Sequence, residues 1–267
     1  MNNNIIPQSI SVSPPSRCSR ILSVWFRHYR VYTKNLMSNG FPPFIEPLFF
    51  LAGIGLGLGK YIGLVEGTPF IQFLATGLII PSAMFTASFE CTFGTFIRLE
   101  FDNIYEGMLS ASISVNDLLT GEMLFCATKG FFYSAAVLFV VAIFGLIPSP
   151  MAVFATVAGF FTGFMFAALS LYVTSFVTNI NHFNFYFTGL LTPMFFFSGI
   201  VFPLSNLPPY LQNSAEIFPL THSVNIVRAF CYNQFHYGLV FDAFYIVAFT
   251  LLFGFLAIRR LKRRLIN

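Results

Sequence analysis

Apolar positions along this chain are grouped in long runs, separated by shorter polar stretches. A helix needs about 20 mostly apolar residues to cross the hydrocarbon core of a bilayer. Runs of that length predict six transmembrane helices, at residues 44–64, 70–96, 123–147, 151–178, 184–203 and 237–258. We therefore expect an all-α integral membrane protein with one six-span transmembrane domain over residues 44–258.

A pattern with a helical period precedes the first apolar run. In residues 20–37 the basic side chains fall on one arc of a helix, and most aromatic and aliphatic ones lie roughly opposite. We expect an amphipathic helix at the membrane surface within residues 20–43, either as a plain anchor or as a partner contact. Its basic and anchoring residues are Arg20, Trp25, Arg27, Arg30 and Lys34. The polar residues 1–19 lack the apolar core of a secretion signal and are expected to form a cytosolic tail.

Composition and charge support a membrane protein with both ends in the cytosol. Of the 267 residues 56% are hydrophobic and only 9% are charged, against about 25% charged in ordinary soluble domains. Ten of the 14 Lys and Arg residues lie before the first span or after the last, the latter in the basic tail 259–267. An even number of spans puts both termini on one side, and the positive-inside rule makes that side the cytosol. The basic residues therefore indicate topology and not nucleic-acid binding.

The longest predicted cytosolic connection, residues 98–122, is acidic. It holds five of the ten Asp and Glu residues. A short helix here would place Ile104 and Met108 on one face, and Asp117 is positioned to cap the helix of the third span. Composition alone favours an ordinary solvated loop over a docking element for a partner protein.

Prolines interrupt the stretch between the last two spans. Proline removes a backbone hydrogen bond that a spanning helix must satisfy internally, so one continuous rod is impossible there. The prolines are Pro193, Pro203, Pro208, Pro209 and Pro219. Irregular backbone at membrane depth is tolerated only where protein or a water-filled cavity surrounds it. The stretch is therefore a candidate lid or lining of a transport path.

Few polar side chains fall inside the predicted spans, and Glu90 is the most prominent. A charge at the bilayer centre costs about 3 kcal/mol on insertion scales, so Glu90 should face protein. A hydrogen bond between helices near the cytosolic end is favoured over a proton relay, because no other acid or histidine aligns with it. Lys129 is expected to snorkel to the interface, with pairing to Glu46 or the acidic loop as the alternative. His222 and Arg228 are expected to form a hydrogen bond or salt bridge within their own segment.

The sequence carries no catalytic or metal-binding pattern. The alternating glycines of residues 53–59 lack both the preceding strand and the following Lys-Ser or Lys-Thr of a phosphate loop. The four cysteines show no metal-type spacing and are interpreted as free packing thiols. We expect no cofactor in this chain and no enzymatic activity, and any ATP that drives it would be hydrolysed by another polypeptide.

Several motifs occur in a characteristic order along the chain. They are GLGLG in the first span, ATGLIIPSAMFTASFE at 75–90, YEGMLSASIS at 105–114, LLTGE at 118–122, TPMFFFSGIVFPLSNLPPYLQ at 192–212 and FPLTHSVNIVRA at 218–229. Together they resemble the permease subunits of ABC-2 type exporters, and most closely the NodJ-like subgroup associated with lipo-oligosaccharide export. The resemblance covers nearly the whole chain, and the last two motifs are its most specific part.

The resemblance implies partners and functional residues. The chain would be a half-transporter that pairs with a second copy of itself and with two ABC ATPase subunits, which bind ATP and Mg. The acidic loop would then be a coupling helix that contacts the ATPase, in contrast to the composition-based preference. Its residues are Tyr105, Glu106, Met108, Leu109 and Asp117. Residues 203–236 would form two short re-entrant helices on the outer side. The pathway or outer-lid residues are Phe195, Phe196, Phe197, Pro203, His222 and Arg228.

The function implied is export of an amphipathic lipid-linked or glycolipid substrate from the bacterial inner membrane. Two alternatives remain at this point. One is a drug or antibiotic efflux permease of the same architecture. The other is a secondary transporter driven by an ion gradient, with Glu90 as the titrating group.

Overall fold

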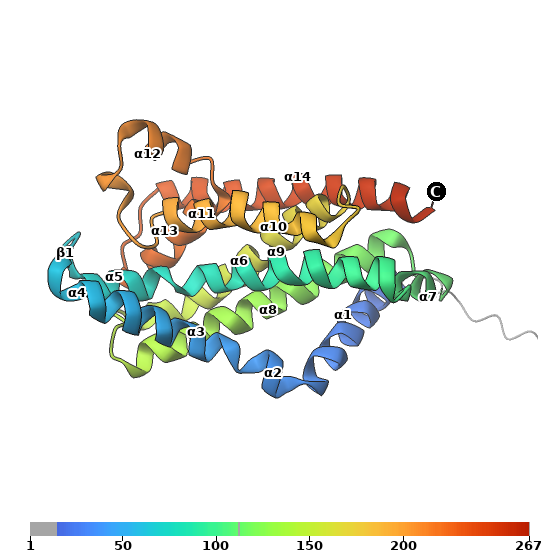
Figure 1. Ribbon diagram of the computed structural model, residues 1–267, viewed down its shortest axis with the longest axis horizontal. Coiled ribbons are helices and arrows are strands. Elements are labelled where there is room, and N and C mark those ends of the chain that lie inside the picture. Colours follow the sequence, from blue (N-terminus) through green and yellow to red (C-terminus); the bar gives the residue numbers. More distant parts are fainter. Residues whose placement is uncertain (1–14, 112, 267) are drawn as a thin grey trace, which may run out of the picture.

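A computed structural model describes residues 15–111 and 113–266, and this part of the chain is almost entirely helical (Figure 1). Most of the predicted tail 1–19, together with Ser112 and Asn267, lies outside the described residues. The amino-terminal elements are α1 (Arg17–Lys34), α2 (Leu36–Gly40), α3 (Pro42–Phe50), the π-helix η1 (Leu51–Leu56), α4 (Gly57–Ile62), β1 (Leu64–Val65), β2 (Thr68–Pro69), α5 (Phe70–Gly77), α6 (Ile79–Phe89), the π-helices η2 (Glu90–Gly94) and η3 (Ile97–Phe101), and α7 (Ile104–Ser110). The strands β1 and β2 pair antiparallel in a small hairpin.

The second half of the chain begins with a long central helix. Its elements are α8 (Val115–Ile143), the 3-10 helix η4 (Pro150–Phe154), α9 (Ala155–Thr174), the 3-10 helix η5 (Ile180–His182), α10 (Phe183–Tyr186), the π-helix η6 (Phe187–Leu191), α11 (Thr192–Phe197), the 3-10 helix η7 (Leu204–Asn206), α12 (Pro209–Ala215), α13 (Pro219–Tyr232) and α14 (Gly238–Ile266). Helix α7 and the end of α14 lie at one end of the molecule, and α12 and the β hairpin lie at the other (Figure 1). We call these the α7 end and the α12 end.

Five helical stretches of the described residues are long and apolar enough to cross a membrane. They are Leu36–Ile62, Phe70–Phe101, Val115–Ile143, Pro150–Thr174 and Gly238–Leu265. The predicted span at 184–203 is not among them. Its helix ends at Phe197, because Ser198 leaves helical geometry and Gly199 takes a φ of 78° that favours glycine. Five of the six predicted spans are therefore long enough to cross a membrane. A shorter helical segment, residues 183–197, stands where the span at 184–203 was predicted.

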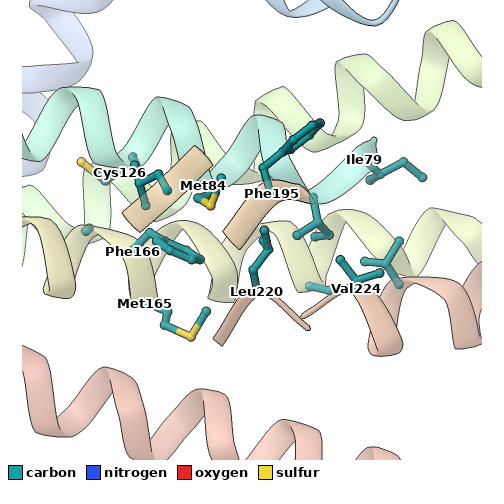
Figure 2. Close-up of a cluster of buried hydrophobic side chains, with 14 of the residues drawn as sticks. Ile79, Met84, Cys126, Met165, Phe166, Phe195, Leu220 and Val224 are labelled. Carbon is teal, nitrogen blue, oxygen red and sulfur yellow. The ribbon is translucent and has the colours of Figure 1, made fainter. Parts of the chain in front are cut away.

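The core forms where α6, α8, α9 and α14 pack against one another. Small residues allow the close approach. A Cβ on Gly130 of α8 would lie only 2.6 Å from the carbonyl oxygen of Gly159 and 3.0 Å from the Cα of Gly163, both on α9. Figure 2 shows the apolar side chains that fill the space between α6, α8, α9, α11 and α13, including Ile79, Met84, Cys126, Met165, Phe166, Phe195, Leu220 and Val224.

The first and last spans lie at the margin of this core. Only 22% of the apolar stretch in Leu36–Ile62 and 17% of that in Gly238–Leu265 is buried, against 78% of that in Phe70–Phe101. The alternating glycines fall in the first of these spans, where η1 widens the helix locally. Of these glycines, only Gly55 meets another helix, with an added Cβ 3.0 Å from Ile71.

The helix before the first span differs in extent from the predicted one. Helix α1 begins at Arg17, where the Ser16 side chain accepts a hydrogen bond from the Ser19 backbone N–H (3.3 Å) and caps the helix. It ends at Lys34, and Asn35 separates it from α2. The amphipathic segment expected at 20–43 therefore consists of α1, α2 and the start of α3.

Candidate functional site

Four charged side chains meet between the second and third spans, from near the α7 end to the middle of α8. We call Glu90, Arg98, Glu122 and Lys129 the charge cluster. Arg98 donates to Glu90 Oε1 (2.7 Å) and to Glu122 Oε1 (2.5 Å), and Lys129 donates to Glu90 Oε2 (2.8 Å). Glu122 is fully buried, and the other three side chains are 12–18% exposed. Two acids and two bases give the cluster no net formal charge, which is the condition under which buried charges are tolerated.

The charge cluster is hydrogen-bonded to the predicted coupling helix α7. The hydroxyl of Tyr105 donates to Glu122 Oε2, and Thr95 donates to Glu122 Oε1 (2.7 Å). Burial, together with the neighbouring Glu122 carboxylate, raises the pKa of Tyr105 well above its ordinary value. The hydroxyl therefore stays protonated and remains a donor. Through this bond α7 is tied directly to the membrane helices.

Sequence reasoning found part of this cluster. Glu90 makes the favoured hydrogen bond between helices, but with Lys129, which lies midway along α8 and not near the α7 end. Lys129 does not snorkel and does not pair with Glu46: it is 12% exposed, pairs with Glu90 and lies 5.3 Å from the ring centroid of Tyr32. The roles of Arg98 and Glu122 were missed. The spacing of Glu90 to Arg98 and of Glu122 to Lys129, about two helical turns each, was the available signal that each pair shares a face.

The predicted coupling residues on α7 are partly buried against the core and partly exposed. Tyr105 points inward, and Met108 and Leu109 are partly buried against the core. Glu106 and Gly107 are exposed, and Gly107 has no atom within 4 Å of the position of an added Cβ. The outward face of α7 therefore carries Glu106 and Gly107, and substitutions at Met108 or Leu109 would disturb the fold as well.

Helix α1 is docked on the start of α8. Asp117 is buried and pairs with Arg20 (2.6 Å) and Arg17 (3.3 Å). The prediction that Asp117 caps α8 is wrong: Ser114 is the cap, and its side chain accepts from the Asp117 backbone N–H (3.2 Å). The Ser hydroxyl reaches this N–H, which leaves the Asp117 carboxylate available to the two arginines.

Further contacts hold α1 in place. The indole N–H of Trp25 donates to Thr128 (3.0 Å), and Val24 sits over Gly121, where an added Cβ would lie 2.7 Å from the Val24 Cβ. The predicted basic face is thus not uniformly turned outward, because Arg20 faces α8. Arg30 and Lys34 are exposed, and Arg27 is half-buried.

An apolar cavity of about 320 Å³ opens between α3, α6, α8 and α11. Phe195 lies at its wall, with ring centroids 5.8 Å from Phe50 and 6.1 Å from Phe85. Phe196 also lines the cavity and is 43% exposed. Phe197 is not among the described lining residues and instead contacts Phe202. Two of the three predicted pathway phenylalanines therefore face this space.

The segment after Pro203 contains η7, α12 and α13. His222 is fully buried, and its Nδ1 is hydrogen-bonded to Asp242 Oδ1 (2.6 Å) while its Nε2 lies 3.0 Å from the Glu216 carbonyl oxygen. The side-chain partner of His222 is thus on α14, outside the 203–236 segment where it was expected. Arg228 does not pair with Glu216. Its guanidinium lies 3.6 Å from the ring centroid of Phe73 and donates to the Ile200 carbonyl (3.4 Å).

Residues 19–232 match the family model described as ABC-2 type transporter. The chain is 34% identical to Nodulation protein J of Sinorhizobium fredii, over 92% of this chain and 94% of that protein. It is 32% identical to Nodulation protein J of Rhizobium meliloti, over 91% of this chain and 93% of that protein. It is also 22% identical to the inner membrane transport permease YadH of Escherichia coli, over 77% of this chain and 80% of that protein.

Proposed function

The chain belongs to the ABC-2 type transporter family, and we propose that it exports an amphipathic lipid-linked or glycolipid substrate across the bacterial inner membrane. Members of this family are membrane subunits, and the family implies an ABC ATPase as the separate energy-supplying partner. The observation that carries the proposal is the near full-length likeness to Nodulation protein J, at 34% identity. The apolar cavity beside α3 and α11 supports a substrate with a hydrophobic part.

The proposed assembly contains two copies of this chain and two ATPase subunits that bind ATP and Mg. In this assembly, residues 183–197 form the sixth membrane passage. Both termini lie in the cytosol, and the α7 end faces the ATPases. Helices α12 and α13 form the outer re-entrant pair. The low burial of the first and last spans, 22% and 17%, supports a second copy or lipid against these faces.

Coupling to the ATPase is assigned to the outward face of α7. A movement of α7 would act on Tyr105, and through its bond to Glu122 on the charge cluster and the second and third spans. The charge cluster also argues against the alternative of an ion-driven transporter. Glu90 is held between Arg98 and Lys129, an arrangement that suits a structural ion pair more than a titrating group.

Co-purification and transport measurements test the function. The chain is expressed with an ABC ATPase from the same organism and reconstituted into vesicles. We expect a stable complex and transport that requires ATP. Transport driven by an ion gradient without ATP would refute the proposal. Mass spectrometry of membranes from a deletion strain should show an accumulated lipid-linked or glycolipid species, whereas unchanged lipids with raised drug sensitivity would indicate an efflux pump.

Substitution of Glu106 by Arg tests the coupling face. Glu106 is exposed, so the fold should be unaffected, while the reversed charge on the docking face should weaken the ATPase complex about tenfold, or ~1.4 kcal/mol. The measurements are co-purification and ATP-dependent transport. Glu216→Arg is the matched control, because Glu216 is an exposed acid near the α12 end. Equal loss of the complex in both variants would contradict the assignment of α7.

Substitution of Phe196 by Ala tests the cavity. Phe196 is 43% exposed and lines the cavity, so we expect slower transport, by about tenfold if aromatic contact with cargo worth ~1.4 kcal/mol is lost. ATPase association should be unchanged. Phe185→Ala serves as control, since Phe185 is 77% exposed and is not among the described lining residues. A transport rate equal in both variants would exclude the cavity as part of the path.

A further inference from the structure

A second cavity, of about 240 Å³, lies at the α12 end and is polar. It is enclosed by the turn between β1 and β2, the loop after α11 and one face of α13. Its described polar lining includes Glu66, Ser198, Ser205, Asn225, Arg228 and Tyr232. The volume is several times the roughly 30 Å³ that one water molecule occupies in the liquid, so the cavity has room for a small polar group.

Arg228 enters this cavity with most of its donors unused. Among the described residues, the only hydrogen bond of its guanidinium is the one to the Ile200 carbonyl (3.4 Å), and its Nε is buried without a partner. The side chain of Ser198 is likewise buried without a partner in the described part of the chain. Burial lowers the pKa of Arg228 to about 10, so the group is still a cation at neutral pH. A partly buried cation with no ion pair among the described residues has little to offset the cost of its desolvation, which points to an anionic ligand.

Phe73 and Gly77 leave room for the Arg228 side chain and fix its position. Phe73 covers one face of the guanidinium, with 3.6 Å between its ring centroid and Cζ. At Gly77, a Cβ would lie 2.8 Å from the Ile200 carbonyl oxygen and 3.3 Å from Arg228 Nη2. Any larger residue at this position would displace the arginine or the loop. The planar cation is therefore held in a fixed orientation at the wall of the cavity.

We propose that this cavity binds an oxyanion, namely a phosphate or carboxylate group, through Arg228 and Ser198. A guanidinium presents several N–H donors in a fixed fork that matches such groups, and the Ser198 hydroxyl adds a further donor. Glu66 is exposed at the cavity and forms no ion pair with Arg228 among the described residues. Its carboxylate partly offsets the charge of Arg228, since it raises the pKa of that group, and it opposes anion binding. This inference goes beyond the proposed function, because it concerns binding that requires neither ATP nor a partner.

Binding of inorganic phosphate to the purified protein tests the proposal. The protein in neutral detergent is titrated with phosphate against chloride at constant ionic strength, and its unfolding temperature is recorded. We expect stabilisation by phosphate, at least tenfold weaker apparent affinity for Arg228→Gln, and tighter binding for Glu66→Gln. Arg260→Gln is the matched control, because Arg260 is also stacked on a phenylalanine, with Cζ 3.8 Å from the Phe176 ring centroid. An unchanged phosphate response in Arg228→Gln would overturn the site.

A second arm distinguishes a lipid headgroup from a free anion. The same variants are reconstituted into phosphatidylcholine vesicles with and without phosphatidylglycerol. Stabilisation by phosphatidylglycerol that depends on Arg228 assigns the site to an anionic headgroup, whereas dependence in the phosphate titration alone assigns it to a free anion. If Arg228→Gln does not fold, Ser198→Ala should weaken phosphate binding and Glu66→Gln should strengthen it. No effect of either substitution would refute the proposal. Neither arm involves the ATPase, so failure of the exporter assignment would not be mistaken for failure of this site.

Discussion

Replacing Arg98 by Met is expected to lower the free energy of unfolding by about 3–5 kcal/mol, the range found when one partner is removed from a buried ion pair. Arg98 bridges Glu90 and Glu122. Without it Lys129 still pairs with Glu90, but Glu122 remains fully buried with only the hydroxyls of Thr95 and Tyr105 as partners. Reversible unfolding in mixed detergent and SDS micelles, followed by circular dichroism, measures the loss.

Two further variants separate the ion pair from a general effect of losing an arginine. Arg30→Met removes an exposed arginine that lies 5.4 Å from the Phe26 ring centroid, and should cost no more than about 1 kcal/mol. The double substitution Arg98→Met with Glu122→Gln removes both charges and should recover part of the loss. If Arg98→Met and Arg30→Met were equally destabilised, the charge cluster would have no special role in stability.

Substitution of Gly130 by Val is expected to destabilise the protein by about 3 kcal/mol or more, at or above the top of the usual range for overpacked cores. The added carbon would meet the Gly159 carbonyl oxygen at 2.6 Å and the Gly163 Cα at 3.0 Å. These are backbone atoms, so α8 and α9 would have to separate along their contact. The same unfolding measurement and the yield of folded protein report the change.

Gly53→Val provides the matched control for this substitution. No atom lies within 4 Å of the position of an added Cβ at Gly53, so the change should stay within about 1 kcal/mol, the scale of helix propensity. The pair of variants also tests the interpretation of the alternating glycines. A large loss at Gly53 would mean that this glycine faces a partner outside this chain, such as a second copy.

The apolar runs were sufficient to predict most of the fold. Their lengths placed five spans, because the need for internal hydrogen bonding in lipid leaves few alternatives to a helix. They failed at 184–203, where hydropathy continues past Phe197 but the backbone turns at Gly199. Hydropathy measures composition and does not register where a glycine with positive φ ends a helix. The proline pattern in the same region did predict the break.

The charged residues show where sequence reasoning stops. The sequence places Glu122 at the end of a predicted solvated loop, residues 98–122, but in the structure it lies on α8 and is fully buried. Its partner Arg98 belongs to another helix, and no sequence spacing reports a pairing across helices. The same limit applies to Asp117, whose arginines come from α1. Arg228 was expected to bond within its own segment, whereas its partners in the structure, Ile200 and Phe73, lie outside it.

The charge cluster also bears on how the chain enters the membrane. Glu90 and Arg98 belong to the same continuous stretch, Phe70–Phe101, and Glu122 and Lys129 belong to Val115–Ile143. Each stretch also carries a further acid nearer its α7 end, Glu100 in the first and Asp117 in the second, but it contributes one acid and one base to the charge cluster, about two turns apart. We therefore expect each helix, if it enters the bilayer on its own, to carry no net charge at the depth of the cluster. We expect the bonds that cross between the helices, from Arg98 to Glu122 and from Lys129 to Glu90, to form when the second and third spans meet in the bilayer.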